Sequence, residues 1–155
     1  MEAIEYAEPE KGLGGQCEAV LRSLPEWFGR EDSIQMYAED IESLDTYTAR
    51  LKGEVIGFFS VKIHNESSAE LYVLAIKPEF HGQGIGTKLY EKVETDLKVQ
   101  SIRFVQVKTL SPTAKDPNYE KTRLFYLALG FLPLEDFPDF WGDDTPCLQM
   151  IKSVG

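Results

Sequence analysis

A glycine-rich stretch at residues 81–87 (HGQGIGT), lying between an apolar segment and an amphipathic one, restricts the fold of this chain most strongly. The residues before it, 70–76, are nearly all apolar, which is typical of a strand buried within a sheet. Behind it, apolar residues recur every fourth position, as on one face of a helix: Ile85, Leu89, Val93 and Leu97. The sequence therefore predicts a buried strand, a glycine turn and a helix in succession.

A turn of this kind is suited to binding phosphate. The first N–H groups of a helix lack intrahelical partners, and the helix dipole favours negative charge beside them. Glycines also let the backbone approach an anion closely. The alternative is a turn that joins strand to helix and binds nothing. Two familiar motifs do not fit: G-x-G-x-x-G needs glycine where Thr87 or Leu89 stands, and in G-x-x-x-x-G-K-[ST] the hydroxyl residue follows the lysine, whereas Thr87 precedes Lys88.

Helical and strand patterns alternate along the rest of the chain. We expect strands at 3–8, 46–51, 55–63, 70–76, 102–109, 131–134 and 146–151, and helices around 17–24, 34–41, 85–98 and 118–129. Pro25 ends the first helix, and Gly130 follows the last at the position where a left-handed residue is favoured. Interleaved helices and strands predict an α/β fold with a mixed sheet. A chain of 155 residues without repeats or linkers predicts a single domain, 1–155.

The net charge of the chain limits the kinds of molecule that it is expected to bind. The chain carries 26 acidic and 16 basic residues, a formal net charge of −10. Nucleic acid and anionic membrane surfaces are therefore disfavoured as partners, while cationic small molecules or basic peptides are attracted. The alternative is that the acidity only keeps the protein soluble.

The two cysteines, Cys17 and Cys147, are too few for a disulfide framework and are expected to be packing residues. The first residues lack the basic and apolar regions of a signal peptide, and no apolar run is long enough to cross a membrane. We therefore expect a cytoplasmic protein. The histidines and cysteines show no spacing typical of metal ligands, so no metal is expected.

The glycine loop fits a third pattern, [R/Q]-x-x-G-x-[G/A]. Gly84 and Gly86 occupy its glycine positions, and His81 stands where Arg or Gln is usual. With this loop the chain resembles the GCN5-related N-acetyltransferase (GNAT) superfamily, in which the loop binds the pyrophosphate of the coenzyme. Most contacts in such a loop come from backbone groups, which His81 also supplies.

Two flanking segments extend the resemblance. Residues 74–80 (LAIKPEF) are similar to the fourth strand of the family and its turn into the loop, and 124–131 (LFYLALGF) to its helix-to-strand segment, F-Y-x-x-x-G-F. The resemblance covers residues 70–131 in the order and spacing of the family. One departure concerns an Asn that often lies seven residues before the helical tyrosine: here Tyr119 takes that position, and Asn118 is one residue out of register.

The resemblance implies a single-domain GNAT-like fold, with a mixed, mostly antiparallel central sheet and helices on both faces. It also implies acetyl transfer from acetyl-CoA to an amine by direct attack, without an acyl-enzyme. The residues it assigns to the coenzyme are Leu74, Ala75, Ile76, His81, Gly82, Gln83, Gly84, Ile85, Gly86, Thr87, Asn118 and Tyr126.

Two catalytic roles are implied by the resemblance. Tyr126 matches the tyrosine that protonates the coenzyme thiolate, the alternative being that its ring only packs and its hydroxyl only hydrogen-bonds the sulfur. Glu70 falls where histone acetyltransferases of this superfamily carry a catalytic glutamate, which makes it the candidate base; the alternative is an exposed carboxylate at the start of a strand. Tyr72 and His64 are the other candidates for the base. A histidine is suited to this role because an imidazole ordinarily titrates near neutral pH.

The acceptor is expected to be a primary amine on a small cationic molecule. The segment 135–144 holds five carboxylates and three aromatic residues, a composition that suits an ammonium group. The expected substrate contacts are Trp27, Phe28, Asp139 and Trp141. The alternative is a solvated loop whose aromatic residues fill the core or a dimer contact, and a homodimer is left open. Two other functions also remain: acetylation of a protein N-terminus or lysine, and a non-catalytic acetyl-CoA sensor.

Overall fold

The computed structural model describes residues 3–142 and 145–155. It contains two compact units, which are described separately below. The first takes in the chain up to Lys62 together with Tyr72–Leu97, and the second comprises Ile63–Leu71 and Lys98–Gly155. Strand β4 (Ser68–Ile76) contributes its first residues to the second unit and its last residues to the first.

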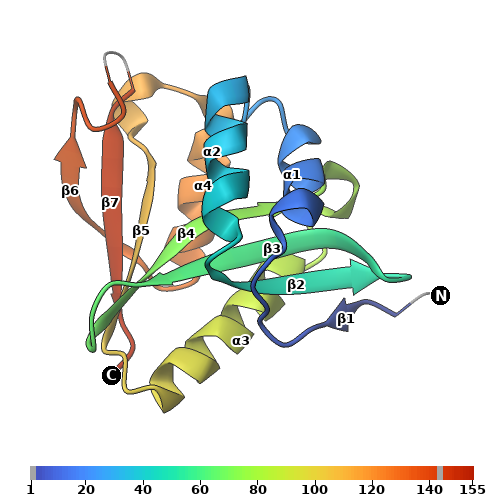
Figure 1. Ribbon diagram of the computed structural model, residues 1–155. Coiled ribbons are helices and arrows are strands. Elements are labelled where there is room, and N and C mark those ends of the chain that lie inside the picture. Colours follow the sequence, from blue (N-terminus) through green and yellow to red (C-terminus); the bar gives the residue numbers. More distant parts are fainter. Residues whose placement is uncertain (1–2, 143–144) are drawn as a thin grey trace. The chain divides into compact units, whose positions relative to one another are not determined.

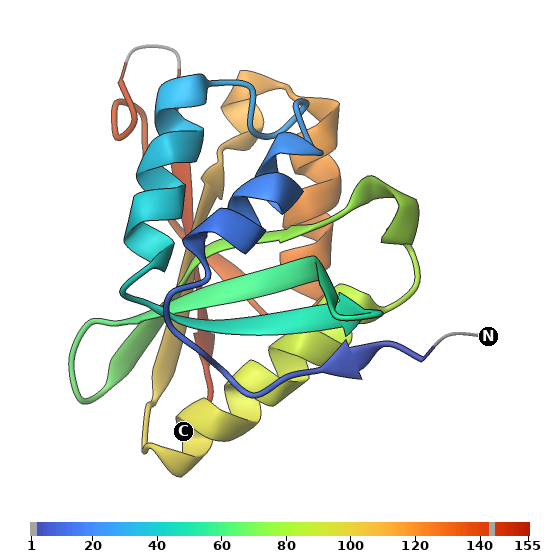
Figure 2. The same cartoon turned by 45° about the vertical axis from the view of Figure 1, so that its right-hand side comes forward.

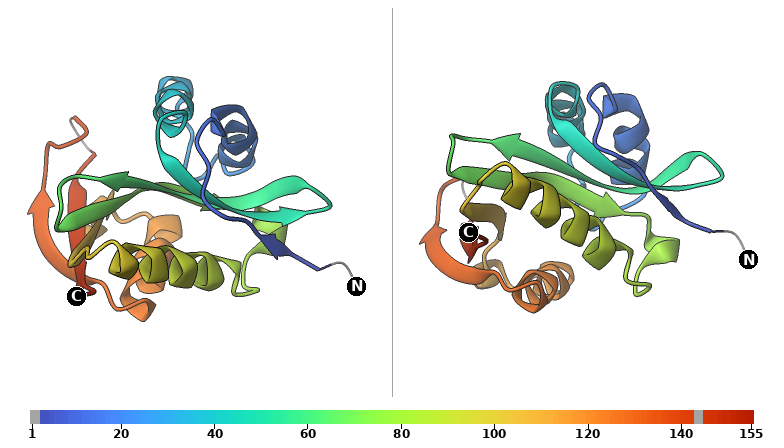
Figure 3. Two further views of the ribbon diagram at one scale, coloured as in Figure 1. Left: turned by 60° about the horizontal axis from the view of Figure 1, so that its bottom comes forward. Right: turned by 90° about the horizontal axis from the view of Figure 1, so that it is seen from below.

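The first unit combines a small sheet with three helices (Figure 1). Its elements are β1 (Glu5–Tyr6), α1 (Gly14–Arg22), α2 (Glu31–Ile41), β2 (Asp45–Leu51), β3 (Glu54–Ile63), the end of β4, a 3-10 turn (Pro78–Phe80) and α3 (Ile85–Val99). Strands β1, β2 and β3 pair antiparallel in that order. Helices α1 and α2 cover one face of β2 and β3, and α3 covers the other (Figure 3).

The periodicity of the sequence accounts for this packing. Every one of the four apolar residues of α3 predicted to share a face is buried: Ile85, Leu89, Val93 and Leu97. Helix α1 buries Cys17, Val20 and Leu21 against residues of α2, β3 and β4. Burying one such side chain contributes roughly 1.5–3 kcal/mol to the free energy of folding. The apolar faces of these helices therefore stabilise their packing on the sheet.

The second unit builds its sheet from the start of β4, β5 (Phe104–Leu110), β7 (Cys147–Ser153) and β6 (Leu132–Phe137), in that order. Residues Ser68–Leu71 of β4 pair in parallel with Phe104–Val107, and the other pairs are antiparallel. The long neighbours β5 and β7 run side by side (Figure 2). A second 3-10 turn (Pro112–Ala114) leads to α4 (Pro117–Ala128).

Local capping chemistry sets the limits of α4. The Asp116 carboxylate accepts a hydrogen bond from the Asn118 N–H, Pro117 occupies the first turn, and Gly130 follows the helix with φ of 101°. These are the usual start and stop signals of a helix, and Gly130 takes the left-handed conformation predicted for it.

The predicted fold class is confirmed: the structure is α/β, with seven strands that are mostly antiparallel. One boundary prediction was wrong. Strand β6 continues to Phe137, so Glu135 and Asp136 belong to a strand and not to the acidic loop. The reason is a register shift after Pro133 that lets Glu135–Phe137 pair with β7; charged side chains on such an edge strand also discourage pairing with other chains. Two further residues of that predicted loop, 143 and 144, lie outside the described residues. None of the described helices has the length and apolar character needed to cross a membrane.

Candidate active site

The predicted phosphate loop in the first unit is open around its glycines. Gly82 and Gly84 have φ of 76° and 79°, the left-handed conformation that glycine adopts most easily. A Cβ atom at either position would meet no atom within 4 Å. The Lys88 N–H donates to the Gly84 carbonyl, so the N–H groups of residues 85–87 lie in the open first turn of α3. This geometry suits the phosphate groups of a coenzyme.

His81 closes the start of this loop. Its Nε2 lies 2.7 Å from the carbonyl oxygen of Ile76, and because a carbonyl only accepts, Nε2 carries the proton. The ring of Trp27, an expected substrate contact, meets the His81 ring edge-on with centroids 5.9 Å apart. In this unit Trp27 therefore lies beside the predicted phosphate loop.

The end of β4, Leu74–Ile76, is held against β3. The Lys77 N–H donates to the Ile56 carbonyl at 2.8 Å, and a Cβ on Gly57 would lie 2.5 Å from Ile76 Cδ1. Ala75 is buried, and Leu74 and Ile76 are half-buried. A fixed strand end of this kind is suited to presenting backbone groups to a ligand.

Three aromatic rings and a carboxylate form a cluster in the first unit. The Tyr37 ring meets the ring of Phe28 edge-on with centroids 6.0 Å apart, and that of Tyr72 edge-on with centroids 5.8 Å apart. These three rings are called the aromatic wall below. The Tyr72 hydroxyl donates a short hydrogen bond to Asp40, and Lys62 Nζ lies 5.9 Å from the Tyr72 centroid. Sequence analysis predicted Phe28 as a contact and considered Tyr72, but it missed Tyr37 and Asp40.

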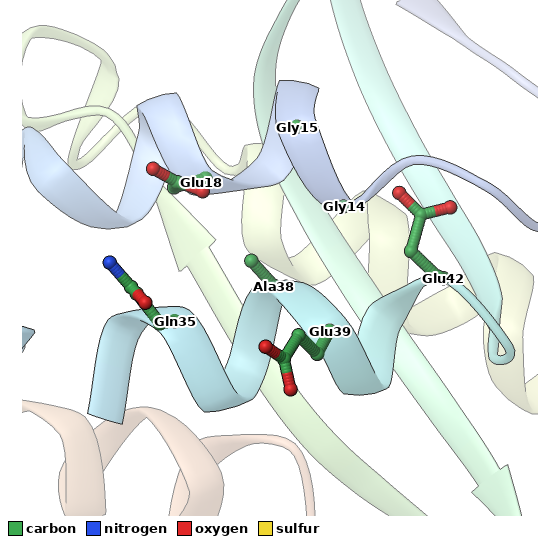
Figure 4. A pocket seen from close by; sticks show the side chains of 7 residues that line it. All are labelled: Gly14, Gly15, Glu18, Gln35, Ala38, Glu39 and Glu42. Atoms are coloured by element: carbon green, nitrogen blue, oxygen red, sulfur yellow. The ribbon is translucent and has the colours of Figure 1, made fainter. Parts of the chain in front are cut away.

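A groove of about 260 Å³ runs between α1 and α2 (Figure 4). The helices approach closely there, since a Cβ on Gly14 would lie 2.3 Å from the Ala38 carbonyl oxygen. Three carboxylates line the groove: Glu18, Glu39 and Glu42. They add to the negative potential of this unit, which attracts cations.

The candidate base, Glu70, is in the second unit and is not an exposed carboxylate. It is 5% exposed, and its two oxygens each lie 3.2 Å from Lys108 Nζ. His64 Nε2 lies 2.6 Å from Oε1 of the same carboxylate. The ring of Phe140 lies over Lys108, with its centroid 5.7 Å from Nζ. Sequence analysis named Glu70 and His64 separately and did not predict Lys108 or the contact between them.

Tyr126 is also in the second unit, on α4, and is buried. Its ring contacts those of Phe125 and Phe131, and its carbonyl accepts a hydrogen bond from the Phe131 N–H. This packing fixes the ring. Asn118 lies in the first turn of the same helix and is half-buried, held by the cap that Asp116 provides.

The other two expected substrate contacts, Asp139 and Trp141, lie in the loop after β6. Asp139 is exposed. The Phe140 ring contacts the rings of Phe137 and Trp141, yet Phe140 is 51% and Trp141 37% exposed. These two aromatic side chains therefore do not fill the core.

Both cysteines are buried, as expected of packing residues. Burial raises the pKa of Cys17 to about 12 and that of Cys147 to about 11. Lys108 lowers the pKa of Cys147, whereas Glu70 and Asp136 raise it. Because the thiolate is the nucleophilic form, neither thiol is suited to forming an acyl-enzyme. No group of three or more metal-ligating side chains occurs in the ranges 3–142 and 145–155.

Comparisons with known proteins agree with the motifs. Residues 17–131 match the model of the Acetyltransferase (GNAT) family. An uncharacterized N-acetyltransferase of Chlorobaculum tepidum is 32% identical over 118 residues, which cover 74% of this chain and 68% of that protein.

Solved structures share the fold at low sequence identity. A GNAT family acetyltransferase from Desulfovibrio desulfuricans superposes over 100% of both chains with a TM-score of 0.82 at 16% identity. The aminoglycoside 6'-N-acetyltransferase from Enterococcus faecium covers 97% of each chain with a TM-score of 0.73 at 21% identity. Since the family model spans most of the chain and a curated relative is 32% identical over 118 residues, the chain belongs to the GNAT family and is an acetyl-CoA-dependent N-acetyltransferase.

Proposed function

We propose that this enzyme, acting as one domain over residues 1–155, acetylates a primary amine on a small cationic molecule. The observation that carries the proposal is the pairing of the Asp40 carboxylate with the aromatic wall of Phe28, Tyr37 and Tyr72. A carboxylate beside aromatic faces attracts an ammonium group through both charge and cation–π interaction. The net charge of −10 and the acidic groove between α1 and α2 draw cations toward the same unit.

The coenzyme is assigned to the open loop. When bound, acetyl-CoA supplies the acetyl group as a thioester. The N–H groups of Gly82–Thr87 would hold its pyrophosphate, with space around Gly82 and Gly84 for the phosphate oxygens. Leu74 and Ile76 would pair with its pantetheine arm, since they lie beyond the four residues of β4 that pair with β5. Asn118 is the remaining coenzyme contact that we propose.

Two steps of the reaction need proton transfer. The acceptor ammonium must lose a proton before its nitrogen can attack, and we assign that step to the cluster around Glu70. The departing thiolate gains a proton, which the Tyr126 hydroxyl is suited to donate, and the buried, ring-packed position of Tyr126 keeps its side chain in one orientation. The thiols play no part, because burial keeps them protonated.

The fold similarity to an aminoglycoside acetyltransferase is consistent with a small polyamine-like acceptor. A basic peptide carries the same ammonium group and is the alternative acceptor that the test must separate.

The test is release of free thiol from acetyl-CoA in the presence of separate amines: polyamines, aminoglycosides, amino acids and basic peptides. We expect release with a small polycation, and a strong reduction in Tyr126→Phe. Release with peptides alone would replace the small-molecule acceptor by a peptide. Coenzyme binding without release on any amine would favour the sensor function.

A further inference from the structure

The buried carboxylate of Glu70 lies between a cation and an imidazole. Lys108, on the neighbouring strand β5, has its Nζ 3.2 Å from both carboxylate oxygens. His64, in the turn between β3 and β4, has its Nε2 2.6 Å from Oε1. All of these groups belong to the second unit. Glu70 is 7% exposed in its side chain, Lys108 22% and His64 30%, so the imidazole is the most exposed member of the cluster.

The chemistry of the contacts determines which nitrogen of His64 carries a proton. An ammonium group only donates, so both oxygens of Glu70 accept from Lys108. A contact of 2.6 Å between an imidazole nitrogen and a carboxylate oxygen requires a proton between them. Nε2 of His64 therefore carries the proton, and in the neutral ring Nδ1 holds the free lone pair.

The surroundings leave Nδ1 available. Among residues 3–142 and 145–155, Nδ1 of His64 has no hydrogen-bond partner, and the backbone N–H of His64 is already used by the Ser68 carbonyl. Asp136 and the buried thiol of Cys147 are the further titratable groups nearby, since Lys108, Glu70 and Asp136 all affect the pKa of that thiol. Burial raises the pKa of that thiol to about 11, so the thiol is not a proton acceptor near neutral pH.

Glu70 itself is poorly placed to remove a proton from a substrate. Its Oε1 is shared by His64 and Lys108, its Oε2 is bound by Lys108, and almost none of its surface is exposed. A general base must come within hydrogen-bond reach of the proton that it removes. The His64 side chain is 30% exposed and its Nδ1 makes no hydrogen bond among the described residues, whereas the oxygens of Glu70 are already engaged.

We propose that His64 is the proton acceptor of the reaction and that Glu70 is a positioning residue, held in place by Lys108. The inference rests on the proposed function. In the step, an N–H bond of the substrate ammonium breaks, its electron pair stays on nitrogen, and the proton forms an N–H bond at Nδ1 of His64. The resulting imidazolium is stabilised by the Nε2–H···Oε1 contact with Glu70, and the proton later leaves from Nδ1 to water.

The first experiment reads the protonated nitrogen directly, without any turnover. The chain has two histidines, so two-bond ¹H–¹⁵N correlation spectra of the rings are simple, and His64→Gln assigns them. We expect the neutral His64 ring to be protonated at Nε2 in the wild type, and to become a mixture of the two tautomers in Glu70→Ala, which removes the acceptor. The His81 ring, held by the Ile76 carbonyl, serves as the internal control and stays unchanged. A His64 protonated at Nδ1, or a spectrum insensitive to Glu70→Ala, would overturn the pairing.

The second experiment is a double-mutant cycle on kcat/KM for the best amine of the panel. We expect His64→Gln to lower kcat/KM by about 10²-fold near neutral pH and to remove the limb of the pH profile that rises with pH. Glu70→Gln should lower kcat/KM less than His64→Gln does. The double variant should have the same kcat/KM as His64→Gln alone, because both substitutions impair the same proton transfer. Glu66→Gln, an exposed carboxylate in the same turn, is the matched control and should leave the profile unchanged.

The outcomes separate this inference from the proposed function. Wild-type activity that survives in His64→Gln but falls in Glu70→Gln would make Glu70 the base and leave the function standing. A wild type that binds acetyl-CoA but releases no thiol with any amine would contradict the proposed function and the role of His64 together. The tautomer measurement still reports in that case whether the His64–Glu70 pair exists, and each variant is compared by coenzyme binding and thermal unfolding to show that it is folded.

Discussion

Lys108 Nζ lies 3.2 Å from each carboxylate oxygen of Glu70, and so supplies the cationic partner of a buried acidic group. Removing Lys108 leaves the buried Glu70 carboxylate with no cation and with the His64 N–H as its remaining side-chain partner. We therefore predict that Lys108→Met lowers the free energy of unfolding by on the order of 3 kcal/mol. Urea-induced unfolding of the wild type and the variant measures the difference.

The control for this prediction is the double variant Glu70→Gln/Lys108→Met, which also replaces the Glu70 carboxylate by a neutral amide. It should be more stable than Lys108→Met alone, because a neutral amide is less costly to bury than an unpaired charge. Equal stability of the two variants would show that the pair contributes little to folding.

Gly84 tests the phosphate loop. With φ of 79° and open space where a Cβ would lie, Gly84→Glu strains the backbone and places a carboxylate where the pyrophosphate is proposed to bind. We expect coenzyme binding to fall below detection by isothermal titration calorimetry. Retained affinity would place the coenzyme elsewhere.

The chain offers a close control for this substitution. Gly53, in the turn between β2 and β3, has φ of 80° and equally open surroundings. Gly53→Glu therefore carries the same backbone strain and the same added charge. It should lose similar stability and keep normal affinity for acetyl-CoA, which separates an effect on the phosphate site from an effect on folding.

The sequence predicted those parts of the molecule that depend on local patterns. The face of α3 that carries Ile85 and Leu89 repeats with the period of a helix, and the stop of α4 at Gly130 depends on one backbone conformation. Both are properties of a short segment, so both were predictable. Membership in the GNAT family followed from one such segment, the loop that contains Gly84, together with its neighbours.

The contacts that give the site its chemistry join distant parts of the chain. Glu70 and Lys108 are 38 residues apart, and Tyr72 and Asp40 are 32 apart. No periodicity links such residues, since each pairing depends on how strands and helices are placed in the fold. The extension of β6 to Phe137 was missed for a related reason, because it depends on a register shift against β7.

Tyr126 tests the proposed proton donor. Tyr126→Phe removes the hydroxyl while keeping the ring that packs against Phe125 and Phe131. We expect kcat to fall by roughly 10²-fold, with a smaller change in KM for acetyl-CoA, because proton donation acts in the transition state. Steady-state kinetics at saturating amine measure both constants.

A hydroxyl deletion elsewhere shows whether the loss is specific. Tyr90 is buried on α3 and donates a hydrogen bond to Glu94 at 2.8 Å. Tyr90→Phe should cost about 1 kcal/mol of stability through that lost bond and leave kcat unchanged. An unchanged kcat in Tyr126→Phe would remove its assigned role.

Asp40 tests the proposed amine site. Asp40→Asn keeps the shape beside Tyr72 and removes the negative charge. We expect KM for a cationic amine to rise about tenfold, corresponding to roughly 1.4 kcal/mol, with KM for acetyl-CoA unchanged. Glu39→Gln, the exposed neighbour on α2, is the control for a general loss of negative charge. An equal rise in both variants would indicate long-range attraction and no specific contact with Asp40.

The two thiols give a prediction about pH. Burial raises the pKa of Cys17 from 9.0 to about 12 and that of Cys147 from 9.0 to about 11, so both thiols stay neutral in the folded protein where an unfolded chain would ionise. The stability that depends on the neutral thiols is therefore complete below about pH 9 and decreases as the pH rises toward 11–12. We expect native protein at about pH 8 to react with iodoacetamide far more slowly than unfolded protein, because the thiolate is the reactive form. Mass spectrometry of the labelled protein counts the modified cysteines. Rapid labelling of Cys147 without unfolding would show that its thiol is accessible and ionised, and would reopen the acyl-enzyme route that its burial argues against.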